Sequence, residues 1–190
     1  MDASFADVSG TKRGVARAPS DVRMDLDHQT YLKMLLCEIA DRLESIIGRE
    51  DAESFLFASG AAVGRWLAAQ YDEELGGLPS DPARLAEILV DLRHRIGGDF
   101  AIDDVSGSRI RLVIGQCPYG PRGHGLTPLC AITSSIVGRI AAEGSGYAAV
   151  HLAETIAEGA MACHVIVDLD EQASDAECRE YFRIGTGTDG

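Results

Sequence analysis

Apolar residues recur at helical spacing through the first half of the chain. In the segments 27–47, 51–75 and 82–96 they fall three or four positions apart, which is the period of an amphipathic helix. We therefore predict three N-terminal helices. Their apolar faces are expected to consist of Leu32, Leu35, Leu36, Ile39, Leu43 and Ile46, of Phe55, Ala58, Ala62, Trp66 and Ala69, and of Leu85, Ile88, Leu89, Leu92 and Ile96.

Acidic residues and proline mark the starts of two of these helices. Asp51 is placed to open the second helix, and Asp81 precedes Pro82 in the arrangement that suits an N-cap and a first helical position. Gly60 and Gly64 lie one turn apart inside the second helix. Because each costs about 1 kcal/mol relative to alanine, we expect the pair to let a neighbouring helix or a second subunit approach closely. A gap left for a ligand is the weaker alternative.

The hydrophobic period changes near residue 100. Short apolar runs at 100–103, 109–114, 147–152 and 162–168 predict strands, and a helix is expected at about 128–143 between the second and third of them. After the N-terminal helices the order is thus strand-strand-helix-strand-strand. This order predicts an α+β fold, with a four-stranded antiparallel sheet that carries its helices on one face.

Composition divides the chain into one body and two tails. Residues 1–24 mix small and charged residues without a period, so we predict a disordered tail. Residues 25–169 are predicted to form a single domain. Residues 170–190 are acidic and polar and are expected to form a flexible tail that holds Cys178, which we do not count as a ligand.

The net charge of −13 argues against nucleic acid as a partner, because such binding depends on neutralising phosphates with Lys and Arg. No apolar stretch reaches the ~18–20 residues that span a bilayer, and the polar N-terminus does not resemble a secretory signal. We expect a cytoplasmic protein without a membrane partner. In that compartment its five cysteines are expected to be reduced thiols or metal ligands.

The chemistry of the chain is concentrated in a loop that begins at Cys117 and ends at Cys130. The loop is rich in proline and glycine, which favours one fixed shape. Cys130 falls in the first turn of the predicted helix, with Thr127 placed to cap it, and the positive end of the helix dipole favours a thiolate there. Cys163 begins a later strand. Since thiolates bind zinc and iron–sulfur clusters, we predict a metal or cluster site at Cys117, Cys130 and Cys163.

The residues leave several points of this site open. Zinc needs a fourth ligand, for which His124 is the nearest candidate and His151 and Glu154 are others; an iron–sulfur cluster is equally compatible with the spacing. The same cysteines are alternatively structural thiols or a redox pair, with Cys130 the best candidate for a reactive thiol. Cys37 lies off the apolar face of its helix, and we expect a structural or surface role for it and not that of a ligand.

Motifs of common enzyme classes are missing from the sequence. The Gly-rich loop lacks the Lys-Ser/Thr ending of a phosphate loop, and no nucleophile elbow is present. Cys163 and His164 make a poor catalytic pair, because adjacent residues on a strand point to opposite faces. No enzymatic activity is predicted.

Several segments together resemble the methanogen output domain family. They are Cys117-Pro118-Tyr119-Gly120, Pro128-Leu129-Cys130, 136–143, 146–159 and Cys163-His164-Val165-Ile166-Val167, with 90–100 among the helices. The resemblance covers about residues 28–169 and implies a sensory or output module, of a kind often attached to histidine kinases.

The family is similar in layout to the 4-vinyl-reductase-type ligand-sensing domains, which place a cysteine-ligated zinc beside a small-molecule pocket. Ile156 stands near the position where those zinc-bearing relatives have a further cysteine.

We accordingly expect a signal-transduction domain with a three-cysteine site. Its expected partner is a second copy or a signalling protein such as a histidine kinase. The alternatives are a module that binds a small apolar ligand or a partner helix and has structural cysteines, and a thiol redox protein.

Overall fold

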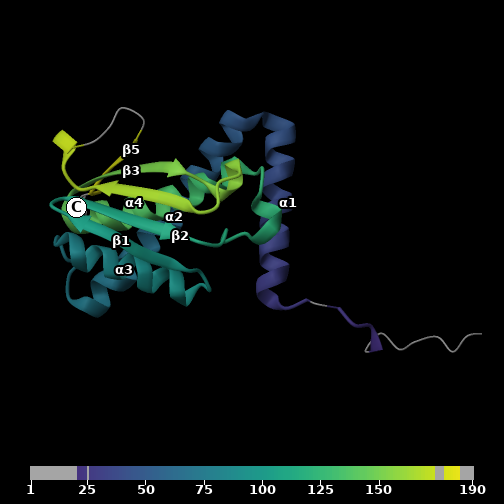
Figure 1. The fold of residues 1–190 in the computed structure, drawn as a ribbon, viewed down its shortest axis with the longest axis horizontal. Helices are drawn as coiled ribbons and strands as arrows, with labels where there is room; N and C mark the ends of the chain where they lie inside the picture. Colours follow the sequence, from purple (N-terminus) through teal and green to yellow (C-terminus); the bar gives the residue numbers. More distant parts are fainter. Residues whose placement is uncertain (1–20, 25, 174–177, 185–190) are drawn as a thin grey trace, which may run out of the picture.

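The computed structural model describes residues 21–24, 26–173 and 178–184. Three helices come first, as predicted, and a sheet with one inserted helix follows (Figure 1). The helices are α1 (His28–Ile47), α2 (Arg49–Leu75), α3 (Pro82–Arg95) and α4 (Cys130–Ser145). The strands are β1 (Phe100–Ser106), β2 (Arg109–Ile114), β3 (Tyr147–Glu154), β4 (Cys163–Asp168) and β5 (Arg179–Phe182).

The sheet is antiparallel and has five strands in the order β1-β2-β4-β3-β5. The α+β class is confirmed, but the prediction of four strands was wrong. The additional strand β5 lies in the segment predicted to be a flexible tail, and it pairs with β3. Tyr181 explains its attachment: the side chain is buried, its hydroxyl lies 3.0 Å from the Ser134 hydroxyl, and its ring lies against Gly138 of α4.

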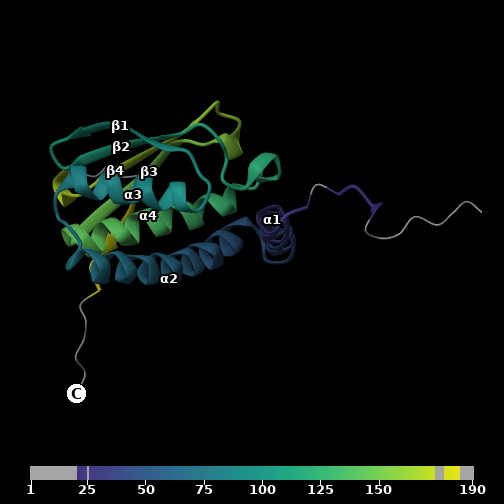
Figure 2. The ribbon, with the colours of Figure 1, turned by 90° about the horizontal axis from the view of Figure 1, so that it is seen from below.

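The helices form layers below one face of the sheet (Figure 2). α3 and α4 lie directly against the strands, and α2 lies on the far side of α4. The core between the sheet and the first helical layer consists of inward-facing residues such as Ile110, Leu112, Ile140, Val165 and Val167. α1 crosses one end of this body and contacts α2 and the loop that follows β2.

The glycine pair of α2 serves helix packing, as predicted. A Cβ atom at Gly60 would lie 2.8 Å from the Cα atom of Ile132 and also meet Ser135, and a Cβ at Gly64 would lie 2.9 Å from Cβ of Arg139. All three neighbours belong to α4. The missing side chains therefore allow the two helices to approach closely.

The apolar faces predicted for the first two helices point largely to solvent and not into the core. Leu32, Leu35 and Ile39 of α1 are exposed, while Cys37 and Ala40 face the body. On α2 the predicted stripe, including Phe55 and Trp66, also faces outward. The physical reason is close packing, because the buried sides carry mainly small residues. On α2 the buried residues are Ala52, Leu56, Gly60, Ala61, Gly64 and Ala68.

Of the three residues predicted to open or cap a helix, one does so in the structure and two do not. The Asp81 side chain accepts a hydrogen bond from the Arg84 N–H at 3.0 Å, with Pro82 at the start of α3. α2 begins at Arg49 behind Gly48, so Asp51 lies inside the first turn and does not cap it. Thr127 begins a short 3-10 turn, η3 (Thr127–Leu129), and makes no side-chain cap for α4.

Within the described residues, no helix has the length and apolar character needed to cross a membrane. The predicted N-terminal tail, residues 1–24, lies almost wholly outside the described part of the chain, as do two parts of the predicted C-terminal tail, 174–177 and 185–190.

Candidate functional site

The register of the sheet brings the three predicted cysteines to one end of the domain. Ile114, the last residue of β2, pairs with Cys163, the first residue of β4. Cys117 follows three residues after Ile114, and the loop that it opens returns beneath the sheet to Cys130, the first residue of α4. The meeting of these sulfurs, which are remote in sequence, follows from antiparallel pairing.

The three cysteines line one apolar pocket of about 30 Å³. That volume holds on the order of one water molecule. The remaining lining residues come from β2, the loop, α4, β3 and the turn that precedes β4. They are Ile114, Pro118, Tyr119, Gly123, Leu126, Leu129, Thr133, Leu152, Thr155, Ala157 and Val165.

Hydrogen bonds hold the loop closed over this pocket. The Gly125 N–H donates to the Ala157 carbonyl at 2.9 Å, which ties the loop to the turn η4 (Ile156–Glu158). The Tyr119 hydroxyl donates to the Leu129 carbonyl at 3.2 Å across the loop. Positive φ angles of 70° and 83° at Gly120 and Gly125 permit bends that a residue with a Cβ rarely adopts.

Burial makes the pocket unfavourable for bare thiolates. Burial, together with the nearby Cys163, Cys117 and Glu158, raises the pKa of Cys130 to about 12. Burial also raises the pKa of Cys163, which is opposed by the Ile156 N–H that donates to its sulfur at 3.2 Å. The expectation that the start of α4 favours a Cys130 thiolate was therefore wrong, because desolvation outweighs the helix dipole. This removes the main support for a reactive thiol at this position.

The side chains do not present a ready metal site. Among the described residues, no group of three or more His, Cys, Asp and Glu side chains is arranged to hold a metal ion. His124 is exposed on the loop, and Glu154 lies 3.7 Å from His164 on the exposed side of β4. The acidic side chain that interacts with Cys130 is Glu158. A metal at the three cysteines remains a prediction.

Two further residues lie in this region, and Arg93 was missed from the sequence. Cys37, expected in a structural or surface role, is buried on α1 with its sulfur 4.0 Å from the Tyr119 carbonyl, and it interacts electrostatically with Cys117. Arg93 of α3 is buried beside the same end of the sheet. Its spacing offered a signal, since it lies four residues after Leu89 and eight after Leu85 on the inward face.

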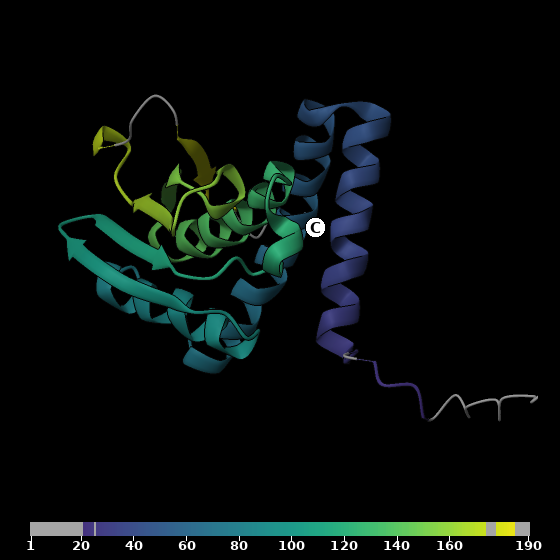
Figure 3. The same ribbon diagram turned by 45° about the vertical axis from the view of Figure 1, so that its right-hand side comes forward.

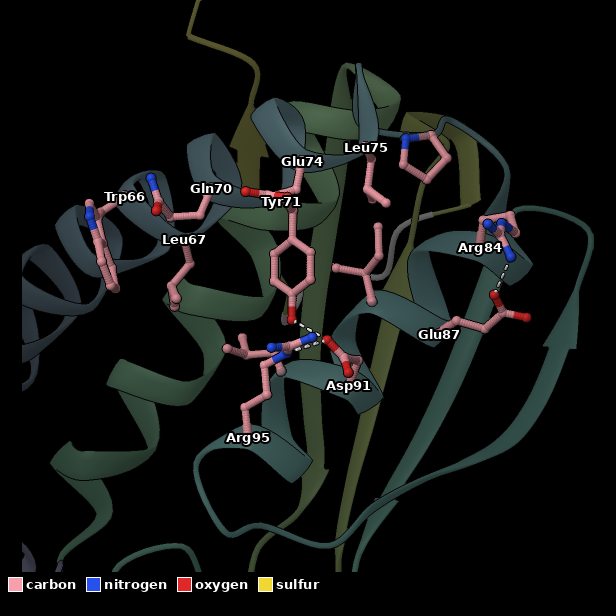
Figure 4. Close-up of a pocket in the computed structure, with 13 residues that line it drawn as sticks. Trp66, Leu67, Gln70, Tyr71, Glu74, Leu75, Arg84, Glu87, Asp91 and Arg95 are labelled. Atoms are coloured by element: carbon pink, nitrogen blue, oxygen red, sulfur yellow. Dashed lines mark hydrogen bonds and ion pairs between the residues drawn. The ribbon is translucent and has the colours of Figure 1, made fainter.

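A second hollow lies between α2 and α3 (Figure 4). It is an open groove of about 650 Å³, and Trp66 lies at its edge. At its floor Asp91 accepts hydrogen bonds from the Tyr71 hydroxyl and from Arg95, each at 2.7 Å. The pair of bonds satisfies the carboxylate, so the groove presents a solvated surface without an unpaired reactive group among these three side chains. The cysteine pocket is the better candidate site.

Solved structures share this fold at low sequence identity. The phenol-responsive sensory domain of the transcription activator PoxR, solved with phenol, matches with a TM-score of 0.55 and 14% identity over 77% of each chain. Subunit 3 of a trafficking protein particle complex from Naegleria fowleri, covalently bound to palmitic acid, matches with a TM-score of 0.54 and 13% identity over 82% of this chain and 98% of that one. No curated protein matches the sequence significantly.

A family model matches most of the body of the chain. Residues 35–168 match methanogen output domain 1, which includes the cysteine loop, the pocket and most of α1. The resemblance noted in the sequence is thereby confirmed. The chain belongs to the methanogen output domain 1 family.

Proposed function

We propose that this domain is a sensor in which a small apolar molecule enters the cysteine pocket and changes the packing of α1. Family membership and the fold shared with a phenol-responsive sensory domain support a sensory role. The pocket supplies the apolar lining and the few polar groups that small-molecule sites typically combine.

One observation carries the proposal: the residues that line the pocket are also the residues that hold α1. Tyr119, Leu126 and Leu129 line the pocket, and the same three belong to the small apolar cluster that contains Cys37 and Ala40 of α1. Figure 3 shows the loop running against α1. A change in the conformation of the loop therefore alters the apolar contacts that hold α1.

A polar contact reinforces the connection. Arg122, in the turn η2 (Gly120–Gly123), donates to the Glu38 carboxylate of α1 at 2.9 Å. Both side chains are about half exposed, so the pair adds little stability, but it fixes which part of α1 faces the loop.

The small volume of the pocket explains why a bound molecule would change the conformation of the loop. Ligand pockets for drug-sized molecules are on the order of 300–1,000 Å³, whereas this one measures about 30 Å³. Even a molecule of one aromatic ring must displace its lining. The sheet and α4 are held by continuous hydrogen bonding and core packing, so the loop is the lining element that yields.

The test fills the pocket covalently and needs no knowledge of the natural ligand. Cys117 is retained, the other four cysteines are replaced by alanine, and the protein is treated with benzyl methanethiosulfonate. Hydrogen–deuterium exchange is then measured across α1. We expect faster exchange in residues 36–43, by about tenfold if the contact with the loop weakens by about 1.4 kcal/mol.

Two controls separate pocket filling from modification. A methyl adduct at Cys117 should have a smaller effect than the benzyl adduct. A benzyl adduct at Cys178, with the other four cysteines replaced by alanine, should leave α1 unchanged, since Cys178 is not among the pocket residues. Unchanged exchange in α1 with the benzyl group on Cys117 would refute the proposed connection.

We propose that the exposed face of α1 receives a second copy of this chain. Leu32, Leu35, Ile39 and Ile46 are all between 43% and 77% exposed, and their spacing of three, four and seven residues is that of a coiled-coil seam. In α1 the half before residue 36 carries the single charged side chain Lys33, whereas the later half carries Glu38, Asp41, Arg42 and Glu44. Antiparallel pairing would bring the basic half of one copy beside the acidic half of the other.

Oligomeric state tests this interface. Light scattering during size exclusion should give a dimer for the wild type and a monomer for the double variant Leu35→Asp, Ile39→Asp. The control Phe55→Asp changes an exposed residue of α2 and should leave the dimer intact. A wild-type monomer at micromolar concentration, or a dimer that survives the double change, would contradict the pairing.

A metal or iron–sulfur site at Cys117, Cys130 and Cys163 is the second candidate function. The observation that favours it is that three thiols line one pocket; binding would have to draw the sulfurs together, since the described residues show no ligating arrangement. Elemental analysis and acid-labile sulfide in anaerobically purified protein test it. About one zinc or one cluster per chain, lost in the triple alanine variant, is the expected result, and protein free of metal and sulfide would refute it.

A further inference from the structure

Arg93 is a buried cation, and two of its side-chain nitrogens have no hydrogen-bond partner among the described residues. The residue is 7% exposed, and its Nε and Nη2 atoms make no hydrogen bond to any described residue. The guanidinium stacks on Phe100, with Cζ 4.5 Å from the ring centre, and packs against Gly98. Burial lowers the pKa of Arg93, but arginine stays charged in proteins. An unpaired buried charge is costly, so its retention calls for an explanation.

The two unpaired nitrogens form one binding edge. Nε and Nη2 lie on the same side of a guanidinium and together match the two oxygens of a carboxylate. The chain uses this edge elsewhere: Arg109 donates from Nε and Nη2 to the two carboxylate oxygens of Asp168 at 2.6 and 3.0 Å. Arg93 has the same pair of donors, and neither of them is hydrogen-bonded to a described residue.

Arg93 does not itself line the cysteine pocket, but it lies beside residues that do. Phe100, on which the guanidinium stacks, pairs with Ile114, and Ile114 pairs with Cys163 in the next strand. The ionisable groups that act on Arg93 are Tyr119, Asp99, Cys117 and Cys163. Three of these four line the pocket, and the Asp99 carboxylate already accepts from the Gln116 N–H at 3.2 Å.

We infer that the molecule sensed is a small carboxylate whose apolar body occupies the cysteine pocket and whose carboxylate pairs with Nε and Nη2 of Arg93. This inference rests on the proposed function and specifies its ligand class. The apolar lining offers nothing to select for charge, whereas the guanidinium selects an anion. An apolar carboxylate satisfies both.

Matched acids and amides test the inference by calorimetry on the full chain. The probes are acetate, butyrate and benzoate, each compared with its neutral primary amide of nearly the same shape. We expect at least one acid of the series to bind about tenfold or more tightly than its amide. Arg93→Met should abolish this preference, and Arg93→Lys, which keeps the charge but loses the paired donors, should retain only part of it.

A stability measurement accompanies the binding experiment and guards against misfolding of the variant. Because Arg93→Met removes an unpaired buried charge and keeps an apolar side chain on Phe100, we expect its melting temperature without ligand to equal or exceed that of the wild type. A variant that unfolds at a clearly lower temperature would show that Arg93 already pairs inside the protein, for instance with a thiolate, and would overturn the inference.

The remaining outcomes are equally decisive. Binding of no acid in the series, equal binding of acid and amide, or undiminished preference in Arg93→Met would each overturn the assignment of the ligand class. The benzyl adduct at Cys117 does not depend on Arg93. If that adduct alters α1 while no acid is preferred, only the ligand class fails; if acids bind through Arg93 while α1 never responds, the proposed sensory connection fails.

Discussion

Gly60→Ala probes the contact between α2 and α4 on which the helical layers depend. Carbon atoms in van der Waals contact lie about 3.5–4.0 Å apart, and the new methyl would lie 2.8 Å from Cα of Ile132. Since that atom is backbone, α2 must move away from α4 by roughly 0.7–1.2 Å. Overpacking of this kind costs about 1–3 kcal/mol, and the better helix propensity of alanine returns about 1 kcal/mol. The difference is a net loss of about 0–2 kcal/mol in the free energy of unfolding. Because the new methyl would also meet Ser135 and the Ile132 carbonyl, we expect the upper half of that range, about 1–2 kcal/mol.

Urea unfolding followed by circular dichroism measures this loss, which corresponds to a melting temperature lower by about 2–8 °C. Ser59→Ala is the matched control. Ser59 is exposed on the same helix, and its hydroxyl donates only to the Phe55 carbonyl one turn earlier, so its replacement should be neutral or slightly stabilising. If Gly60→Ala were as stable as the control, the two helices would not be in the close contact described here.

Three further changes test other parts of the structure. Tyr181→Phe removes the buried hydrogen bond between the Tyr181 and Ser134 hydroxyls and should lower the free energy of unfolding by about 1 kcal/mol. An unchanged free energy in urea unfolding would mean that β5 does not pack on α4 as described. Asp168→Asn breaks the pair with the partly exposed Arg109 and should cost about 2 kcal/mol, whereas Asp104→Asn, in an exposed pair with Arg111, should stay within about 0.5 kcal/mol. The pKa of Cys130 is raised from 9.0 to about 12 in the folded protein. Between these two values the thiol ionises in the unfolded chain and stays protonated in the folded one. The free energy of unfolding therefore falls by up to about 1.4 kcal/mol per pH unit as the pH rises above about 9. Cys130→Ala should remove that part of the alkaline loss, and an unchanged pH profile in this variant would show that the thiol is not buried.

The periodicity of the chain predicted the elements well because their core faces are regular. Leu85 and Leu89 in α3, and Val165 and Val167 in β4, repeat at helical and strand spacing and are buried. The strand β5 was missed because four residues with one buried side chain, Tyr181, are too short to establish a period. α1 and α2 show a different limit: their large apolar residues were assigned to the core, but small residues such as Gly60 and Ala40 form the buried sides.

The clustering of the three cysteines was predictable because each lies at or near the end of a strand or helix that the sequence indicates. Cys117 follows three residues after the end of β2, Cys163 opens β4 and Cys130 opens α4, so strand pairing brings them to one pocket. The burial that raises the pKa of Cys130 was not predictable, because it depends on how the loop closes over the sulfur. Arg93 is buried on α3, a helix whose last turn also contains His94 and Arg95. Its spacing from Leu85 and Leu89 placed it on the inward face, but its position beside the cysteine pocket follows only from the fold.

Hydrogen exchange of α1 tests the central claim most directly, because that claim connects pocket occupancy to a helix outside the pocket. With a benzyl group on Cys117, amides in residues 36–43 should exchange about tenfold faster than in the unmodified protein, while the core strand β4 keeps its protection. Equal exchange in α1 with the pocket filled and unfilled would contradict the account.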